Sequence, residues 1–258
     1  MMIKKENEKF APSAILEGMT SVSALLNSSP DVNSRKIERI LIDRSKRKSK
    51  AAEIGFLTAK SHELGFSIEF VEPEEIERIA VGTSHGGVLA FCTERELKVL
   101  TADSIRENGF YVYLEGVEDP YNFGYTLRSL YAAGVDGVIL PPRNWMTAAG
   151  VVARSSAGAS ELIPMFCATS ESLVACFRER GYRILCAGIR NSVSLYEEHF
   201  PYPLLLVVGG EKRGISRNLL DAADQIVRID YGRAFRGSLS AASAATVMAF
   251  EIFRQNKT

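Results

Sequence analysis

The stretch DPYNFGYTLRSLYAAG (residues 119–134) places an asparagine and an arginine on one predicted helix, directly after an apolar run. Asn122 lies at the start of this helix, where its side chain could act on a ligand or merely cap free backbone N–H groups. Arg128 lies about 100° around the helix from the centre of the apolar stripe. An arginine there can hold a phosphate or a reacting oxygen in a cleft, although an exposed helix arginine is the simpler alternative.

Two later loops also combine small residues with polar side chains. GGEKRGIS (residues 209–216) is a glycine-rich turn that contains Glu211, and glycine allows a backbone to approach a ligand closely. This turn matches neither GxGxxG nor a Walker loop, so by itself it is a weak signal. Residues 230–253 comprise a loop and a helix that begins almost entirely with Ser and Ala. Such a helix can pack closely against a ligand, a threaded loop, a second subunit or simply a protein core.

All three loops follow short apolar runs that are separated by helical segments. This arrangement predicts strands buried on both faces of a mainly parallel sheet, in an α/β fold. In such sheets ligands bind at the carboxyl ends of the strands, which is where the three loops lie. The predicted strands are residues 111–116, 137–140, 162–165, 183–187, 204–208 and 226–229. The helix within residues 119–134 is predicted to bury a stripe formed by Phe123, Leu127, Leu130, Tyr131 and Gly134.

A separate, smaller α/β pattern precedes this sheet. Its apolar runs lie at residues 37–42, 66–71 and 87–91, and its predicted helix lies at residues 51–64. The polar segment that follows ends in Asn108-Gly109, which is a strong turn signal. We therefore predict two domains, a smaller α/β domain at residues 1–105 and a parallel-sheet α/β domain at residues 110–258.

The chain has no net charge, with 31 basic and 31 acidic side chains, which argues against a uniformly basic surface for nucleic acid. The distribution is uneven, because residues 35–50 contain eight Lys or Arg against only Glu38 and Asp43. Candidate phosphate-binding residues lie there between a strand-like run and a helix: Lys46, Arg47, Lys48 and Lys50. A solvated helix start is the alternative explanation for this patch.

Several other classes of protein are disfavoured. The opening residues contain no apolar stretch before a small-residue cleavage site, so no signal peptide is predicted. The apolar runs are far shorter than the roughly 20 residues that span a bilayer. We therefore expect a soluble, cytoplasmic protein. The cysteines form no CxxC pair and no zinc-ligand spacing with histidine, which predicts free thiols and no metal site: Cys92, Cys167, Cys176 and Cys186.

Taken together, the three loops resemble the signature motifs of the SpoU/TrmH-type RNA 2′-O-ribose methyltransferases of the SPOUT superfamily. The first motif reads Asp119-Pro120-x-Asn122-x-Gly124, followed by Arg128-Ser129 and Gly134. The second reads Gly209-x-Glu211-x-x-Gly214-Ile215-Ser216. The third is Ile229 followed by Ser238-Leu239 and a helix of small residues.

The resemblance extends over nearly the whole chain. ARSSAGASELIP (residues 153–164) is similar to a further segment of the family. EGMTSVSALL (residues 17–26) and SHGGVLA (residues 84–90) resemble the ribosomal-protein-like substrate-binding domain that many members carry. The resemblance therefore implies an RNA-binding first domain and a methyltransferase second domain.

The family resemblance implies a fold and a reaction that composition and periodicity would not suggest. It implies a deep trefoil knot in the carboxy-terminal domain, S-adenosylmethionine as cofactor, and a homodimer in which the subunit interface completes the active site. The implied reaction is methyl transfer to a ribose 2′-hydroxyl of structured RNA. Ribosomal RNA is favoured over transfer RNA as the substrate because of the first domain.

The resemblance also implies roles for individual residues. Backbone groups at Gly209, Ile229 and Leu239 would hold the cofactor. Arg128 would be the main catalytic residue, and because arginine stays protonated, electrostatic positioning of the ribose and its phosphate suits it better than simple general-base action. Three further roles are implied. Asn122 would orient the active-site loop, and Glu211 would anchor the knot or the arginine of a second copy. Ser238 would contact the substrate or the cofactor loop.

The third motif departs from the family pattern. Asp230-Tyr231 replaces the usual Pro-Met, Ser240 replaces the usual asparagine, Ala242 replaces a serine, and one extra residue separates Ile229 from Leu239. A serine hydroxyl cannot reproduce the donor and acceptor of an amide. Three hypotheses follow: an active RNA ribose methyltransferase, an RNA-binding relative with little or no catalysis, and a nucleotide-binding α/β protein outside this superfamily.

Overall fold

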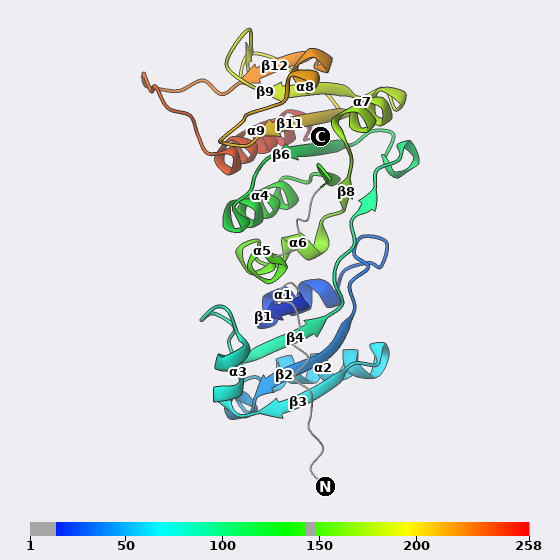
Figure 1. Ribbon diagram of the computed structural model, residues 1–258, viewed down its shortest axis with the longest axis vertical. Helices are drawn as coiled ribbons and strands as arrows, with labels where there is room; N and C mark the ends of the chain where they lie inside the picture. Colours follow the sequence, from blue (N-terminus) through cyan, green and yellow to red (C-terminus); the bar gives the residue numbers. More distant parts are fainter. Residues whose placement is uncertain (1–13, 143–147, 258) are drawn as a thin grey trace.

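The computed structural model describes residues 14–142 and 148–257. These residues form two α/β units stacked along the long axis of the molecule (Figure 1). One unit holds a four-stranded sheet and the other an eight-stranded sheet, counted over the described residues. The predicted order, a smaller α/β unit before a parallel-sheet unit, is confirmed. The prediction that there is no signal peptide concerns mainly residues 1–13, and these residues lie outside the part that the structure describes.

The first sheet has the strand order β1-β4-β2-β3. Strand β2 pairs parallel with β3 and antiparallel with β4. Its strands are β1 (Ile15–Glu17), β2 (Ile37–Asp43), β3 (Ser67–Val71) and β4 (Val88–Cys92). The helical elements of this unit are α1 (Gly18–Leu26), η2 (Arg44–Lys46), α2 (Ala51–Leu64) and α3 (Pro73–Ile79). The strands and the helix predicted from the apolar runs of this unit are therefore confirmed.

The second sheet has the order β10-β12-β9-β11-β6-β7-β8-β5, and its strand pairs are parallel. Its strands are β5 (Lys98–Val99), β6 (Phe110–Glu115), β7 (Gly137–Leu140), β8 (Met165–Cys167), β9 (Arg183–Ala187), β10 (Val193–Ser194), β11 (Leu204–Gly209) and β12 (Gln225–Arg228). Sequence reasoning missed the two-residue strands β5 and β10. It also placed a strand at residues 162–165, whereas a short helix ends at Leu162 and β8 begins at Met165.

Helices cover both faces of this sheet. They are η3 (Ala102–Ser104), α4 (Pro120–Ala132), α5 (Ala149–Ser155), α6 (Ala159–Leu162), α7 (Ser170–Glu179), α8 (Arg217–Ala222) and α9 (Ala241–Asn256). Side chains alternate across β6, so Val112 joins a core with α4 and α9 while Tyr113 joins a second core with α7 and α8. Burial on both faces explains why the strands are continuous apolar runs.

Helix α4 differs from the sequence prediction in two details. Its buried face includes Phe123, Leu127 and Leu130, but Tyr131 is 45% exposed. Tyr131 fails to join the stripe because it lies at the edge of that face at the helical period, about 100° from Leu130. Gly134 also lies outside the stripe, since the helix ends at Ala132 and Gly134 adopts a φ of +77° in the following turn.

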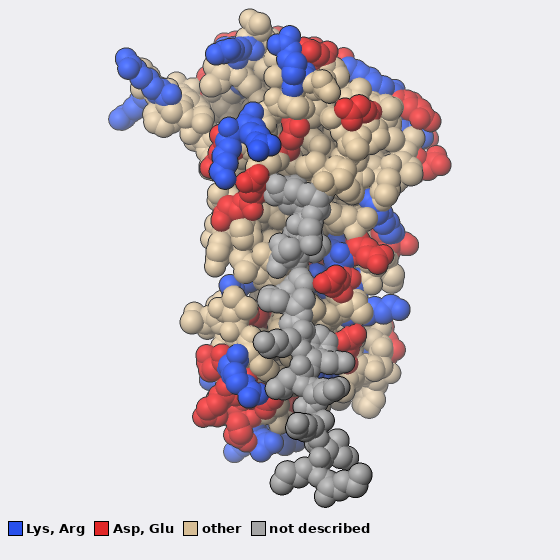
Figure 2. Space-filling model, viewed as in Figure 1, with Lys and Arg blue, Asp and Glu red and all other residues tan. Residues whose placement is uncertain are grey.

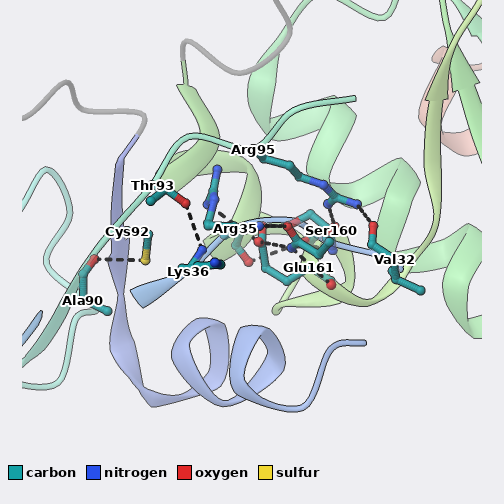
Figure 3. Close-up of polar contacts among 12 residues, drawn as sticks. Val32, Arg35, Lys36, Ala90, Cys92, Thr93, Arg95, Ser160 and Glu161 are labelled. Carbon is teal, nitrogen blue, oxygen red and sulfur yellow. Dashed lines mark hydrogen bonds and ion pairs between the residues drawn. The ribbon is translucent and has the colours of Figure 1, made fainter. Parts of the chain in front are cut away.

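A buried polar network joins the two units (Figure 3). The Glu161 carboxylate lies 3.6 Å from the Arg35 guanidinium and accepts a hydrogen bond of 2.7 Å from the Asn33 side-chain amide. Arg95 donates to the backbone carbonyls of Val32 and Ile163 at 3.1 and 3.2 Å. Because α6 of the second unit supplies Glu161, these contacts set the position of the first unit relative to the large sheet.

Burial changes the titration of groups in this network. It raises the pKa of the Cys92 thiol to about 12, which keeps this side chain protonated at neutral pH. It lowers the pKa of the Arg95 guanidinium to about 10, which leaves the arginine charged at neutral pH. A second ion pair across the boundary joins Arg154 of α5 to Glu17 at the end of β1. The interface is therefore both charged and dehydrated.

Candidate functional site

A cavity of about 630 Å³ opens at the carboxyl ends of β9, β11 and β12. The loops after these strands form its walls, as expected for ligands of a parallel sheet. Predicted site residues that line it are Gly209, Glu211, Ile229, Ser238 and Leu239. Two of the three loops selected from the sequence therefore converge on one cavity, although they are separated along the chain.

The glycines of the β11 loop allow its backbone to fold back on itself. A Cβ atom at Gly209 would lie 2.4 Å from the carbonyl carbon of Gly214, and one at Gly210 would lie 2.1 Å from the oxygen of Gly116. The Gly210 and Gly214 backbones also form an isolated bridge. The glycine-rich turn thus serves close backbone packing beside the cavity, for which a side chain leaves no room.

Replacing Gly209 by alanine is expected to destabilise the protein by roughly 1–3 kcal/mol, because the added methyl group meets backbone atoms that cannot rotate away. Gly55→Ala is the matched control, since nothing lies within 4 Å of a Cβ there and Gly55 lies inside α2. That control is expected to stabilise the protein by up to about 1 kcal/mol. Urea unfolding of both variants measures the difference, and equal midpoints would contradict the packing argument.

The loop between β12 and α9 is anchored at both ends. At its start, the Asp230 carboxylate accepts hydrogen bonds from Ser194 and, at 2.7 Å, from Arg228. These hydrogen bonds hold the pKa of Asp230 below its usual value. At its end, Ser240 caps α9 by accepting a hydrogen bond of 3.1 Å from the backbone N–H of Ser243. The serine that replaces the usual asparagine therefore has a structural role that asparagine could also fill.

Within this loop, the Tyr231 hydroxyl accepts a hydrogen bond of 3.1 Å from the backbone N–H of Leu239. That N–H belongs to a residue expected from the family resemblance to contact the cofactor. In this chain the Leu239 N–H is therefore already hydrogen-bonded within the loop.

The two site residues predicted on α4 lie differently. Asn122, together with Asp119 and Glu211, lines a small cavity of about 130 Å³. The helix cap is Asp119, which accepts a hydrogen bond of 2.8 Å from the Asn122 backbone N–H, so the Asn122 side chain does not provide the cap considered from the sequence. Arg128 is exposed and is not among the described residues that line these cavities. One chain by itself therefore does not bring Arg128 to the site.

The basic residues of the first unit lie around η2 and the start of α2, at the opposite end of the molecule from the cavity (Figure 1). Lys46, Arg47 and Lys48 are exposed, and the Arg47 guanidinium lies 5.1 Å from the centre of the Phe70 ring. Lys50 is half-buried and forms an ion pair of 2.6 Å with Glu53. Lys50 is thus less available to a phosphate than its three neighbours.

Sequence reasoning missed part of the cavity wall. The loop after β9 contributes Gly188, Ile189 and Arg190, and the loop after β12 contributes Phe235 and Arg236. The position of residues 188–190 after a predicted strand was the available signal, because ligands collect at the carboxyl ends of parallel strands. Their residue types alone gave no reason to select them.

Metal ligands do not cluster in the part of the chain that the structure describes. Among those residues, no group of three or more His, Cys, Asp or Glu side chains is placed to hold a metal ion. The cysteines there are free thiols, with Cys92 and Cys186 buried and Cys167 and Cys176 partly buried. Over the same residues, no helix is long and apolar enough to cross a membrane.

The fold and the cavity define a two-unit α/β protein with a ligand site among the loops of its parallel sheet. Residues 109–250 match the SpoU rRNA Methylase family, and residues 15–98 match the family described as RNA 2′-O ribose methyltransferase substrate binding. This chain belongs to the SpoU rRNA methylase family.

Curated relatives align over nearly their whole length. The chain is 29% identical to the 23S rRNA (guanosine-2′-O-)-methyltransferase RlmB of Shewanella oneidensis, over 95% of this chain and 98% of the relative. It is 31% identical to a putative TrmH family tRNA/rRNA methyltransferase of Staphylococcus saprophyticus, over 87% of this chain and 90% of the relative.

Solved structures share the fold. The AdoMet-bound rRNA methyltransferase from Sinorhizobium meliloti superposes with a TM-score of 0.76 at 24% identity, covering 93% of this chain and 86% of that one. The SpoU methyltransferase AviRb from Streptomyces viridochromogenes, in complex with AdoMet, superposes with a TM-score of 0.75 at 23% identity, covering 93% of this chain and 89% of that one. The architecture is therefore that of SpoU-type proteins.

Proposed function

We propose that this protein transfers a methyl group from S-adenosylmethionine to a ribose 2′-hydroxyl of ribosomal RNA in the cytoplasm. The observation that carries the proposal is the cavity in which the second and third family motifs meet. Membership of the SpoU rRNA methylase family and the names of the aligned relatives support the reaction and the RNA class. In this proposal residues 1–105 bind the RNA and residues 110–258 carry out the transfer.

The cavity fits a cofactor of this size and kind. Its volume of about 630 Å³ lies within the range of small-molecule sites. Backbone at Gly209, Ile229 and Leu239 would hold the cofactor, whose bound sulfonium supplies an electrophilic methyl group.

We further propose that the active site is completed in a homodimer with a knotted carboxy-terminal domain. Arg128 is exposed on α4 away from the cavity of its own chain, so a second copy would have to present it. Exposed aromatic side chains on α4 and α9 support an interface there, since large exposed apolar groups commonly mark contact surfaces. They are Tyr121, Tyr125, Phe250 and Phe253. Asn122 would orient the loop beside Glu211, and Ser238 would contact the substrate or the cofactor loop.

The direct test uses ribosomal RNA from cells that lack the protein. The purified protein and S-adenosylmethionine carrying a labelled methyl group are incubated with this RNA, and ribose-methylation sequencing locates the label. Label at one defined 2′-oxygen is the expected result. Absence of label from ribosomal RNA and from transfer RNA tested in parallel would reject the proposed reaction.

The hydrogen bond from Leu239 N–H to the Tyr231 hydroxyl favours a second candidate, an RNA-binding protein with little or no catalysis. A cofactor could then bind the Leu239 N–H only by displacing the Tyr231 hydroxyl from it. Titration with S-adenosylmethionine separates the candidates. Saturable binding supports the enzyme, whereas no detectable binding at millimolar cofactor supports the RNA-binding candidate.

Neutralising the basic patch of the first unit is expected to weaken RNA binding. Replacing Lys46, Arg47, Lys48 and Lys50 by glutamine should lower RNA affinity. It should also reduce the slope of log affinity against log salt concentration, by about 0.7–0.9 for each phosphate that the protein no longer neutralises. Cofactor affinity should stay unchanged because the patch lies far from the cavity. Lys60→Gln, within the helix α2 that follows the patch, is the matched control. Unchanged RNA affinity in the patch variant would show that these side chains are merely solvated.

A further inference from the structure

The loop between β12 and α9 borders a second, open hollow next to the large cavity. This hollow has a volume of about 600 Å³ and is lined by residues 230–235 and Leu239, which all belong to the loop or its end. Asp230, Tyr231, Phe235 and Leu239 line both spaces. A ligand in the hollow would therefore lie directly beside a ligand in the large cavity.

The side chains around the hollow suit a planar, negatively charged ligand. Phe235 is 60% exposed, and its ring centre lies 5.9 Å from that of Tyr231, so two aromatic faces are available to solvent instead of being packed in a core. Arg233 and Arg236 are exposed, and neither forms an ion pair with a described residue. Figure 2 shows basic side chains at the end of the protruding segment that Figure 1 draws in orange between β12 and α9.

The loop is held in place although it protrudes. Asp230 is fixed by Ser194 and Arg228 at one end, and the Tyr231 hydroxyl is fixed by the Leu239 N–H at the other. These contacts orient the Tyr231 ring beside the hollow before any ligand arrives, and the Phe235 ring lies against Tyr231. Such preorganisation lowers the entropy that binding would otherwise lose.

We propose that residues 231–237 form the binding site for the acceptor nucleotide of the RNA. An unpaired base stacks on the Phe235 and Tyr231 rings, and Arg233 and Arg236 contact the neighbouring phosphates. The shared wall then places the ribose of that nucleotide next to the cavity assigned to the methyl donor. This inference rests on the proposed function and assigns to the loop the recognition of the substrate.

Two alanine substitutions, at Phe235 and Arg233, test the proposal. Binding is measured by fluorescence anisotropy with a labelled single-stranded oligoadenylate and by filter binding with ribosomal RNA. Phe235→Ala is expected to weaken binding of both RNAs by about ten-fold, because it removes a stacking face, while Phe235→Tyr retains binding. Arg233→Ala should weaken binding and reduce the salt slope by about 0.7. Because Arg233 lines only the outer hollow, its replacement should leave S-adenosylmethionine affinity unchanged.

Arg217→Ala is the matched control, because Arg217 is exposed on α8 and does not line either cavity within the described residues. In the methylation reaction Arg233→Ala should raise KM for RNA with little change in kcat. If the wild-type protein methylates RNA and both variants bind RNA normally, the assignment of the loop is wrong and the proposed function stands. If the variants lose RNA binding but the wild-type protein shows no methyl transfer, the proposed function fails and the acceptor assignment fails with it, although the loop still binds RNA.

Discussion

Replacing Arg128 by alanine is expected to lower kcat for RNA methylation by about 100-fold or more while S-adenosylmethionine affinity stays close to that of the wild-type protein. The size follows from the loss of one charged donor aimed at a reacting oxygen and its neighbouring phosphate. Cofactor affinity should be retained because the proposed contacts of Arg128 are with the RNA, and among the described residues Arg128 does not line the large cavity of its own chain. Arg128 is exposed, so folding should also be little affected.

Single-turnover methylation and cofactor titration measure the two effects separately. Arg128→Lys should recover only part of the rate, because an ammonium group cannot make the paired contacts of a guanidinium. Arg217→Ala controls for the loss of an exposed arginine elsewhere in the domain. A wild-type rate for Arg128→Ala would remove Arg128 from the reaction.

A mixing experiment tests whether Arg128 acts in the cavity of a second copy. Arg128→Ala is co-expressed with Leu239→Arg, which places a large side chain in the wall of the large cavity. In a mixed dimer, one intact cavity can then receive the intact Arg128 of the other chain. Activity above that of either variant alone is the expected result, and its absence would contradict the intersubunit site.

Replacing Glu161 by alanine is expected to destabilise the protein by about 3–5 kcal/mol, because it leaves a buried arginine without its counter-charge. The side chains of Arg35 and Glu161 are 0% and 3% exposed. Within the described residues, no hydrogen bond reaches the Arg35 guanidinium nitrogens, so Glu161 is its principal electrostatic partner. Loss of Glu161 also removes the carboxylate acceptor of the Asn33 amide. The effect is large relative to total stabilities of roughly 5–15 kcal/mol.

Urea unfolding gives the free energy, with Asp221→Ala as the matched control. Asp221 pairs with Arg217 at 2.9 Å on the surface of α8, where such a pair contributes about 1 kcal/mol or less. Glu161→Gln should be intermediate, because an amide oxygen can still accept from Asn33. Equal decreases in the free energy of unfolding for Glu161→Ala and Asp221→Ala would contradict the importance assigned to the interface network.

The sequence by itself determined the α/β class, the parallel sheet and most of its strands. These follow from local physics, because a strand buried on both faces must be apolar throughout, as in β11, and a helix on a sheet must present a stripe such as Phe123, Leu127 and Leu130. The loops after parallel strands could also be selected from the sequence, and the family resemblance singled out five residues in them that line the cavity: Gly209, Glu211, Ile229, Ser238 and Leu239. Short elements such as β5 could not be predicted from the sequence, because two residues show no periodicity.

Only the tertiary structure decided which of these residues share a surface. Packing between segments far apart in the chain separates Arg128 from the cavity and brings Asn122 next to Glu211. It also buries Glu161 against Arg35. The same holds for the Tyr231 and Phe235 rings, whose role in lining two neighbouring spaces depends on how the β12–α9 loop is anchored. Residue type and spacing predict local conformation, whereas distances across the fold are set by long-range contacts that no local pattern encodes.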